Sequence, residues 1–160
     1  MSNLMVLGLG NALNGDSAVG FYAVRDLYRE GWPEKVAFRH QTAIENGPFS
    51  LEGYSSLLIL EAFQNGHSPG TLYRYGHEEL IEHRSCLRDQ RLWEAITLAE
   101  LLGNPLQVSL LGIEPAELRW DFCLSETIRK VYGQFLDKVR QELHQLLEQA
   151  SIGSPVQPLG

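Results

Sequence analysis

The stretch LMVLGLGNALNGDSAVG, Leu4 to Gly20, begins with a short apolar run that is typical of a buried β-strand. Gly8 and Gly10 then permit a tight backbone turn. Asp16 and Ser17 stand where a helix should begin, and either side chain can cap the free N–H groups of its first turn. We therefore expect a strand, a loop and a helix. The polar groups would lie at the carboxyl end of a central strand, where open α/β sheets bind ligands.

Three interpretations of this loop are open at the level of the residues. Gly8-Leu9-Gly10 begins like a dinucleotide-binding motif, but the third glycine is missing and an acidic residue follows where a pyrophosphate would lie. The second interpretation is that the loop only connects a strand to a helix and binds no ligand. The third interpretation is membership of a protein family, and it depends on the rest of the chain.

Length and composition point to a single globular domain. The chain has 160 residues, of which 44% are hydrophobic, and a formal net charge of −7, which argues against nucleic acid as its main partner. Cys86 and Cys123 lie far apart without a C-x-x-C spacing, as expected of a reduced, cytoplasmic protein. No signal peptide is expected, because residues 1–3 carry no basic side chain and the apolar run after them is too short. No membrane span is expected, because no apolar run approaches roughly 20 residues. We expect one domain over residues 1–150 and a flexible tail over 151–160.

Hydrophobic periodicity predicts strands alternating with helices, and hence a three-layer α/β fold with helices on both faces of the sheet. The apolar runs 4–9 and 56–61 should be adjacent, parallel, central strands. Residues 71–75 alternate apolar and polar side chains, which indicates an antiparallel strand at the sheet edge. The remaining expected elements are strands at 36–38 and 108–113, and helices near 17–30, 90–102 and after Ser125.

The opening loop resembles the motif of the hydrogenase maturation endopeptidases, a strand followed by G-[IVL]-G-N-x-L-x-x-D-[DE]-x-x-G. The residues that match are Gly8, Gly10, Asn11, Leu13, Asp16 and Gly20. Pro69-Gly70-Thr71 and Gly112-Ile113-Glu114-Pro115 also resemble family segments and occur in the same order. Peptidyl-tRNA hydrolases open with a similar GLGN, but they continue with Pro-Gly and a Thr-Arg-His-Asn segment that this chain lacks. The resemblance implies a mostly parallel five-stranded sheet with one antiparallel strand.

The same resemblance proposes metal-binding positions. Glu61 follows the most hydrophobic strand, where the family has an aspartate ligand, and a carboxylate there is costly unless it is paired or bound to metal. Ser17 replaces a family carboxylate that is also a ligand. The third ligand is a histidine in the family, and the candidates here are His83 and Asp89. Together with Asp16 these residues form the expected metal set, and Asp16 and Glu61 are the expected catalytic residues.

Substrate contacts are expected beside this set. Gly10 and Asn11 belong to the opening motif, and His40-Gln41-Thr42 resembles a family segment that positions the substrate. For His40, a structural role as a histidine satisfied by the backbone at a strand end is equally open.

The resemblance implies an endopeptidase that removes the C-terminal peptide of a nickel–iron hydrogenase large-subunit precursor. Nickel of the substrate, or another divalent metal, would be the metal recognised. The partner would be that precursor, with neither nucleic acid nor membrane involved, and the protein would act as a monomer. Because the ligand positions depart from the family, the alternative is a catalytically silent homologue that binds a hydrogenase-like subunit as an assembly factor.

Overall fold

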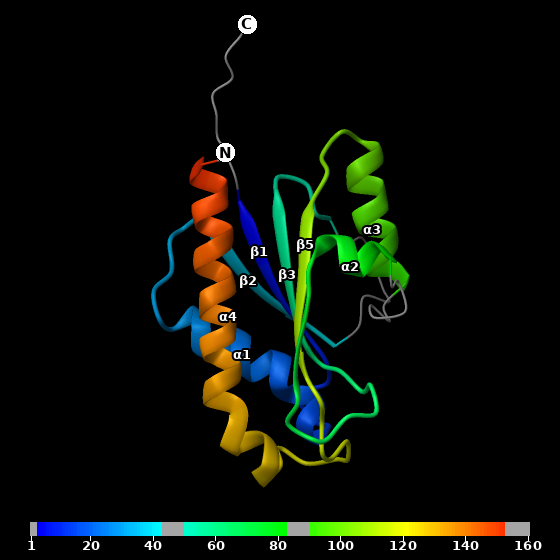
Figure 1. Cartoon of the computed structure of the whole chain (residues 1–160), viewed down its shortest axis with the longest axis vertical. Helices are drawn as coiled ribbons and strands as arrows, with labels where there is room; N and C mark the ends of the chain where they lie inside the picture. The colour runs from blue at the N-terminus through cyan, green and yellow to red at the C-terminus, as the bar shows by residue number, and fades with distance from the viewer. Residues whose placement is uncertain (1–2, 43–49, 83–89, 153–160) are drawn as a thin grey trace, which may run out of the picture.

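A five-stranded sheet in the order β2-β1-β3-β5-β4 forms the middle layer of the computed structural model, which describes residues 3–42, 50–82 and 90–152 (Figure 1). Its strands are β1 (Leu4–Leu9), β2 (Val36–Gln41), β3 (Ser56–Ala62), β4 (Leu72–Tyr75) and β5 (Gln107–Ile113). β1 pairs in parallel with both β2 and β3, and β3 pairs in parallel with β5. β4 pairs antiparallel to β5 at the edge. The predicted α/β class, the adjacent central strands and the antiparallel edge strand are all confirmed.

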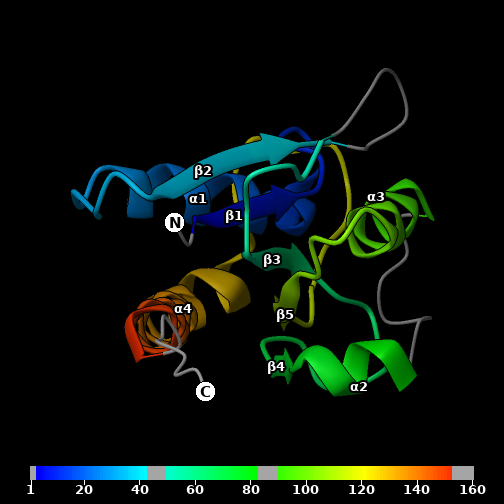
Figure 2. The same ribbon diagram turned by 90° about the horizontal axis from the view of Figure 1, so that it is seen from above.

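Helices cover both faces of the sheet, as Figure 2 shows. A short 3-10 helix, η1 (Gly15–Ala18), leads into α1 (Val19–Tyr28), which lies with α4 (Glu126–Ile152) on one face. On the other face lie α2 (His77–Glu82) and α3 (Gln90–Leu101). Because each strand alternates its side chains between the two faces, two separate apolar cores result. Within the described residues, no helix is both long and apolar enough to cross a membrane.

Two motif glycines let α1 cross the sheet at very short range. A Cβ atom added at Gly20 would lie 2.5 Å from the carbonyl oxygen of Leu60 and 2.7 Å from that of Leu9. A Cβ atom at Gly8 would in turn collide with the carbonyl oxygen of Gly20. The glycines of the opening motif are therefore required by helix-to-strand packing, which places η1 directly beside the ends of β1 and β3.

One helix, α2, lies in a segment for which the sequence predicts no regular element. α2 begins at His77, and its first turn carries Glu78 and Glu79, whose charges suit the positive end of a helix. The backbone N–H of Gly76 donates to Oε1 of Glu79. Only Leu80 of this helix is fully buried, which is too little apolar periodicity to predict a helix.

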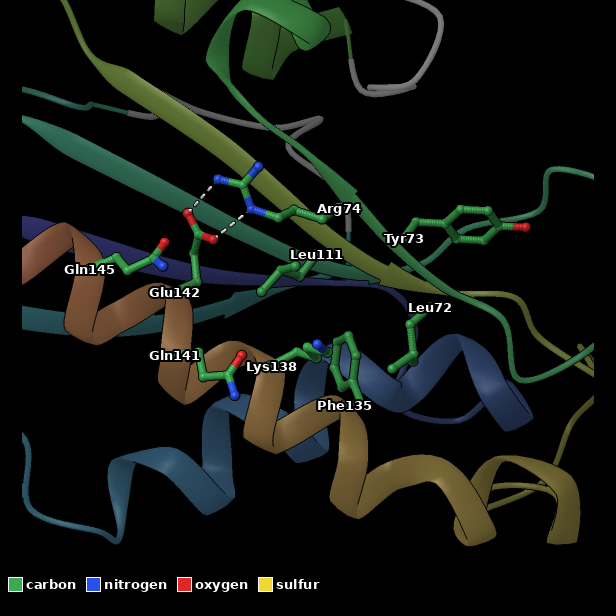
Figure 3. A pocket seen from close by; sticks show the side chains of 9 residues that line it. All are labelled: Leu72, Tyr73, Arg74, Leu111, Phe135, Lys138, Gln141, Glu142 and Gln145. Carbon is green, nitrogen blue, oxygen red and sulfur yellow. Dashed lines mark hydrogen bonds and ion pairs between the residues drawn. The ribbon is translucent and has the colours of Figure 1, made fainter.

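α4 is tied to the edge strand by an ion pair between the exposed Arg74 and the buried Glu142. Arg74 of β4 donates from Nε and Nη2 to the two carboxylate oxygens of Glu142, at 2.7 and 3.2 Å, and Figure 3 shows this fork. It lines a cavity of about 230 Å³ whose apolar wall includes Leu72, Leu111 and Phe135. The pair fixes the position of α4 against a strand that has a neighbour on one side only.

Candidate functional site

The carboxyl ends of the parallel strands β1, β3 and β5 lie at the same end of the sheet, at the bottom of Figure 1. We call this end the carboxyl edge, as distinct from the edge strand β4. The loop after β1 carries η1, and η1 packs against β3. Ser17 Oγ accepts a hydrogen bond from the backbone N–H of Asn11, at 3.0 Å. Gly10 has φ +128°, and a Cβ atom there would collide with the carbonyl oxygen of Ser17. The motif therefore closes a tight loop around Ser17.

Asp16 is completely buried, and both of its carboxylate oxygens accept hydrogen bonds from the loop that follows β5. Oδ2 accepts from the backbone N–H of Ala116 at 2.9 Å and of Glu117 at 2.8 Å, and from the hydroxyl of Ser125 at 2.8 Å. Oδ1 accepts from the backbone N–H of Ser125 at 2.7 Å. The structure thus places this predicted catalytic and metal-binding residue as the anchor of a second loop.

Ser125 has two roles in this arrangement. Besides donating to Asp16, its Oγ accepts from the backbone N–H of Ile128 at 3.3 Å, which is the expected cap at the start of α4. The carboxylate of Asp16 therefore also fixes the first turn of the longest helix.

Glu61 lies near the end of β3, opposite Gly112 of β5, and is half-buried. It projects on the sheet face covered by α3, because Leu60 before it belongs to the other core. η1 packs against the same strand, so Glu61 and Ser17 belong to neighbouring elements at the carboxyl edge.

The predicted substrate-binding residues form one group. Nε2 of His40 lies 2.8 Å from the carbonyl oxygen of Gly10, and the backbone N–H of Gly10 donates to the carbonyl oxygen of Gln41 at 3.2 Å. The imidazole also makes an edge contact with the ring of Phe21. Thr42 is exposed beyond the end of β2. The structure thus brings β2 and the motif loop together and gives His40 a backbone partner.

The third ligand position falls outside the described residues, because both His83 and Asp89 do. Among the residues the structure does describe, no three His, Cys, Asp or Glu side chains are grouped as a metal site requires. Glu61 and Ser17 supply oxygen only, whereas nickel favours at least one nitrogen ligand. The described residues therefore do not fit a nickel site of the chain's own.

Glu114, which the sequence analysis did not select, holds the third loop of this edge. It is 5% exposed, and its Oε1 accepts hydrogen bonds from the backbone N–H groups of Asn65 and His67 and from the hydroxyl of Tyr73. Its backbone pairs with Gly70 and Thr71. The available signal was a carboxylate directly after a buried strand, the same signal that selected Glu61.

We expect Tyr73→Phe to lower the free energy of unfolding by about 1–2 kcal/mol at pH 7, because Glu114 loses one of three donors. Burial alone would raise the pKa of Glu114, but the hydrogen bonds from Tyr73, Asn65 and His67 outweigh burial and hold the pKa below the ordinary value of a glutamate. A carboxyl group whose pKa is lower in the folded protein than in the unfolded chain stabilises the fold at pH values above the unfolded pKa. This stabilisation is lost as the pH falls through the folded pKa. Urea unfolding at several pH values should therefore show that the stability difference between the two proteins shrinks as the pH falls below the ordinary pKa of a glutamate. A difference that does not vary with pH would contradict this account.

Comparison with known proteins fits this geometry. No protein-family profile matches the chain. The hydrogenase expression/formation protein HupD of Thiocapsa roseopersicina is 28% identical over 123 residues, covering 72% of this chain and 55% of the relative. HoxM of Cupriavidus necator, with the same description, is 28% identical over 128 residues, covering 72% and 60%. The chain thus spans little more than half the length of these curated relatives.

Solved structures share the fold. The hydrogenase maturating endopeptidase HybD from E. coli superposes with a TM-score of 0.72 at 22% identity, over 89% of this chain and 93% of that one. The [NiFe] hydrogenase maturation protease HybD from Thermococcus kodakarensis gives 0.64 at 20% identity, over 87% and 97%. The chain is therefore an α/β protein with the fold of hydrogenase maturation proteases. The resemblance indicated by its opening motif is confirmed, since the chain is similar in sequence to hydrogenase expression/formation proteins and in fold to hydrogenase maturation proteases.

Proposed function

We propose that this chain is an endopeptidase that removes the C-terminal peptide of a nickel–iron hydrogenase large-subunit precursor. The observation that carries the proposal is the folded opening motif, which sets η1 beside β3 and so brings Ser17 and Glu61 to the same edge of the sheet. The names of the related proteins and of the structural neighbours support this substrate. We further propose that the protein acts as a monomer in the cytoplasm.

The residues of the edge divide into three roles in this proposal. Glu61 contacts the precursor near its nickel centre, and Gly10 and Asn11 with His40-Gln41-Thr42 position the polypeptide. Asp16 has an indirect, structural role, because its carboxylate holds the loop after β5 in place. When nickel is present in the substrate, it supplies a cation that a carboxylate at this edge attracts.

A second function is favoured by one specific observation. Ser17 stands where the family motif has a carboxylate, and the neighbouring carboxylate of Asp16 is fully engaged by the loop after β5. The expected metal set therefore has fewer carboxylate ligands than the family motif, since Ser17 offers a hydroxyl and Asp16 already accepts four hydrogen bonds. A homologue that binds a hydrogenase-like subunit without cleaving it, as an assembly factor, fits this reduced set of ligands.

Cleavage of a purified precursor distinguishes the two functions. The substrate is the nickel-loaded large-subunit precursor of a nickel–iron hydrogenase from the same source, with its C-terminal extension. The masses of the products are measured by mass spectrometry. Loss of the extension on addition of the protein supports the peptidase. Stable binding without cleavage supports the assembly factor and refutes the peptidase.

We expect Glu61→Gln to slow this cleavage about 10- to 100-fold, because a hydrogen bond to a charged group is worth about 1.5–3 kcal/mol. The substitution keeps the shape of the side chain and removes its charge, so the free energy of unfolding should change little. Glu94→Gln on the exposed surface of α3 is the matched control, and it should leave both quantities unchanged. If the Glu61→Gln variant cleaves the precursor as fast as the wild type, or is about 3–5 kcal/mol less stable, Glu61 has a structural role instead.

A further inference from the structure

Four large apolar side chains are exposed at the carboxyl edge of the sheet, where η1 meets the loop after β5. Trp120 is 76% exposed and Phe122 is 74% exposed, with Leu13 and Leu118 near 40%. We call these four residues the edge patch. Exposed aromatic side chains grouped in this way mark binding surfaces more often than chance exposure does.

The edge patch is built on an ordered base. The backbone N–H of Asp121 donates to the carbonyl oxygen of Leu13, and that of Gly15 donates to the carbonyl oxygen of Asp121, both at 3.2 Å. The hydroxyl of Tyr22 donates to the carbonyl oxygen of Phe122. These bonds hold the two segments that carry the patch against each other, so binding requires little further ordering of the backbone.

A close approach of glycine to the loop adds to this order. Gly15 has φ +53°, and a Cβ atom there would lie 2.8 Å from the carbonyl oxygen of Glu117. The exposed apolar side chains are thus presented by a loop that the buried carboxylate of Asp16 also anchors. Trp120 and Phe122 themselves are excluded from the apolar core.

The edge patch is continuous with the candidate site. Leu13 lies between Asn11 and Ser17 in the motif loop, and these two residues are hydrogen-bonded to each other. Arg119 beside the patch pairs with Glu117 at 3.1 Å, and the exposed Asp121 adds an acidic side chain between Trp120 and Phe122. An occupant that matches this surface is an apolar stretch of polypeptide without acidic side chains, which reaches the candidate site at the same time.

We propose that the edge patch docks the protein substrate, by receiving an apolar segment of the large-subunit precursor while another part of that precursor lies at Glu61. This inference rests on the proposed partner and adds a second contact surface to it. Trp and Tyr side chains are the most frequent energetic centres of protein interfaces, which assigns the main contact to Trp120.

The test compares two double variants whose changed side chains are equally exposed. Trp120→Ala/Phe122→Ala removes the aromatic groups of the patch, and Leu101→Ala/Leu102→Ala removes side chains that are 78% and 76% exposed. Because α3 ends at Leu101, before β5 begins, the control pair lies at the opposite edge of the sheet. Affinity for the immobilised, nickel-loaded precursor is measured by biolayer interferometry, and cleavage is measured by mass spectrometry.

We expect the patch variant to bind the precursor at least about tenfold more weakly, with a raised KM and a nearly unchanged kcat. The control variant should bind like the wild type. Equal weakening of both variants, or no weakening of the patch variant, would overturn the proposal. A wild-type protein that dimerises in sedimentation velocity, with a patch variant that does not, would also overturn it, because a second copy of this chain would then be the occupant.

The outcomes separate this inference from the function on which it rests. Cleavage by the wild type with unchanged KM in the patch variant would refute docking and leave the peptidase in place. Binding without cleavage, lost in the patch variant, would refute the peptidase and support docking. A wild-type protein that does not bind the precursor would refute both.

Discussion

Replacing Asp16 with asparagine should lower the free energy of unfolding by about 3–5 kcal/mol. Both carboxylate oxygens of Asp16 accept a hydrogen bond from a backbone N–H group. In either orientation of the asparagine amide, its NH₂ group would therefore face one of these N–H donors. A buried donor left unsatisfied costs about 1–3 kcal/mol, and the remaining bonds weaken because their acceptor is no longer charged. Urea unfolding at pH 7, monitored by circular dichroism, measures the effect.

Ser125→Ala is the companion of this experiment. It removes the hydroxyl that donates to Asp16 and caps α4, and we expect a loss of about 1–2 kcal/mol. Because the two residues are in direct contact, the double variant should lose less than the sum of the single losses. Glu94→Gln on the exposed surface of α3 controls for loss of charge alone. Additive losses, or a stability of Asp16→Asn close to that of this control, would refute the anchoring role of Asp16.

The second large effect is expected for Gly20→Ala. The new methyl group would lie 2.5 Å from the carbonyl oxygen of Leu60 and 2.7 Å from that of Leu9, and neither backbone oxygen can move without disturbing a central strand. Overpacking of a core costs about 1–3 kcal/mol when side chains can yield, and we expect about 3 kcal/mol or more where backbone must yield. The midpoint of urea unfolding should fall accordingly.

Gly133→Ala provides a control of opposite sign. Gly133 lies inside α4, and nothing comes within 4 Å of a Cβ atom added there. The same substitution should therefore raise the free energy of unfolding by about 0.5–1 kcal/mol, because alanine is the better helix former. If both variants shift the midpoint in the same direction, the close crossing of α1 over the sheet is not the reason for Gly20.

The sheet could be predicted from the sequence because its signal is local. Each central strand is a short apolar run, and the expected boundaries 4–9 coincide with β1. Parallel order followed from the helical segments between the runs. α2 was not predicted, since one buried leucine in six residues gives no helical period. The strand at 36–38 extends to Gln41, because pairing with β1 continues through the polar residues His40 and Gln41.

The site was predictable only in part, because its partners are distant in sequence. The carboxyl edge, the motif loop and the neighbourhood of Gly10 with His40 could be expected from strand ends alone. The donors that surround Asp16 could not, since they come from Ala116, Glu117 and Ser125, about a hundred residues later. A carboxylate is costly to bury without partners, but the sequence does not say whether those partners are a metal or N–H groups.

The bonds of Asp16 also set an order of events while the chain is being made. Ribosomes deliver the amino terminus first, so β1, η1 and α1 emerge long before residues 116, 117 and 125. Until those residues emerge, the carboxylate has none of its four donors, and the edge patch has no loop on which to form. The loop that carries Trp120 and Phe122 therefore reaches its folded position only after the start of α4 has left the ribosome.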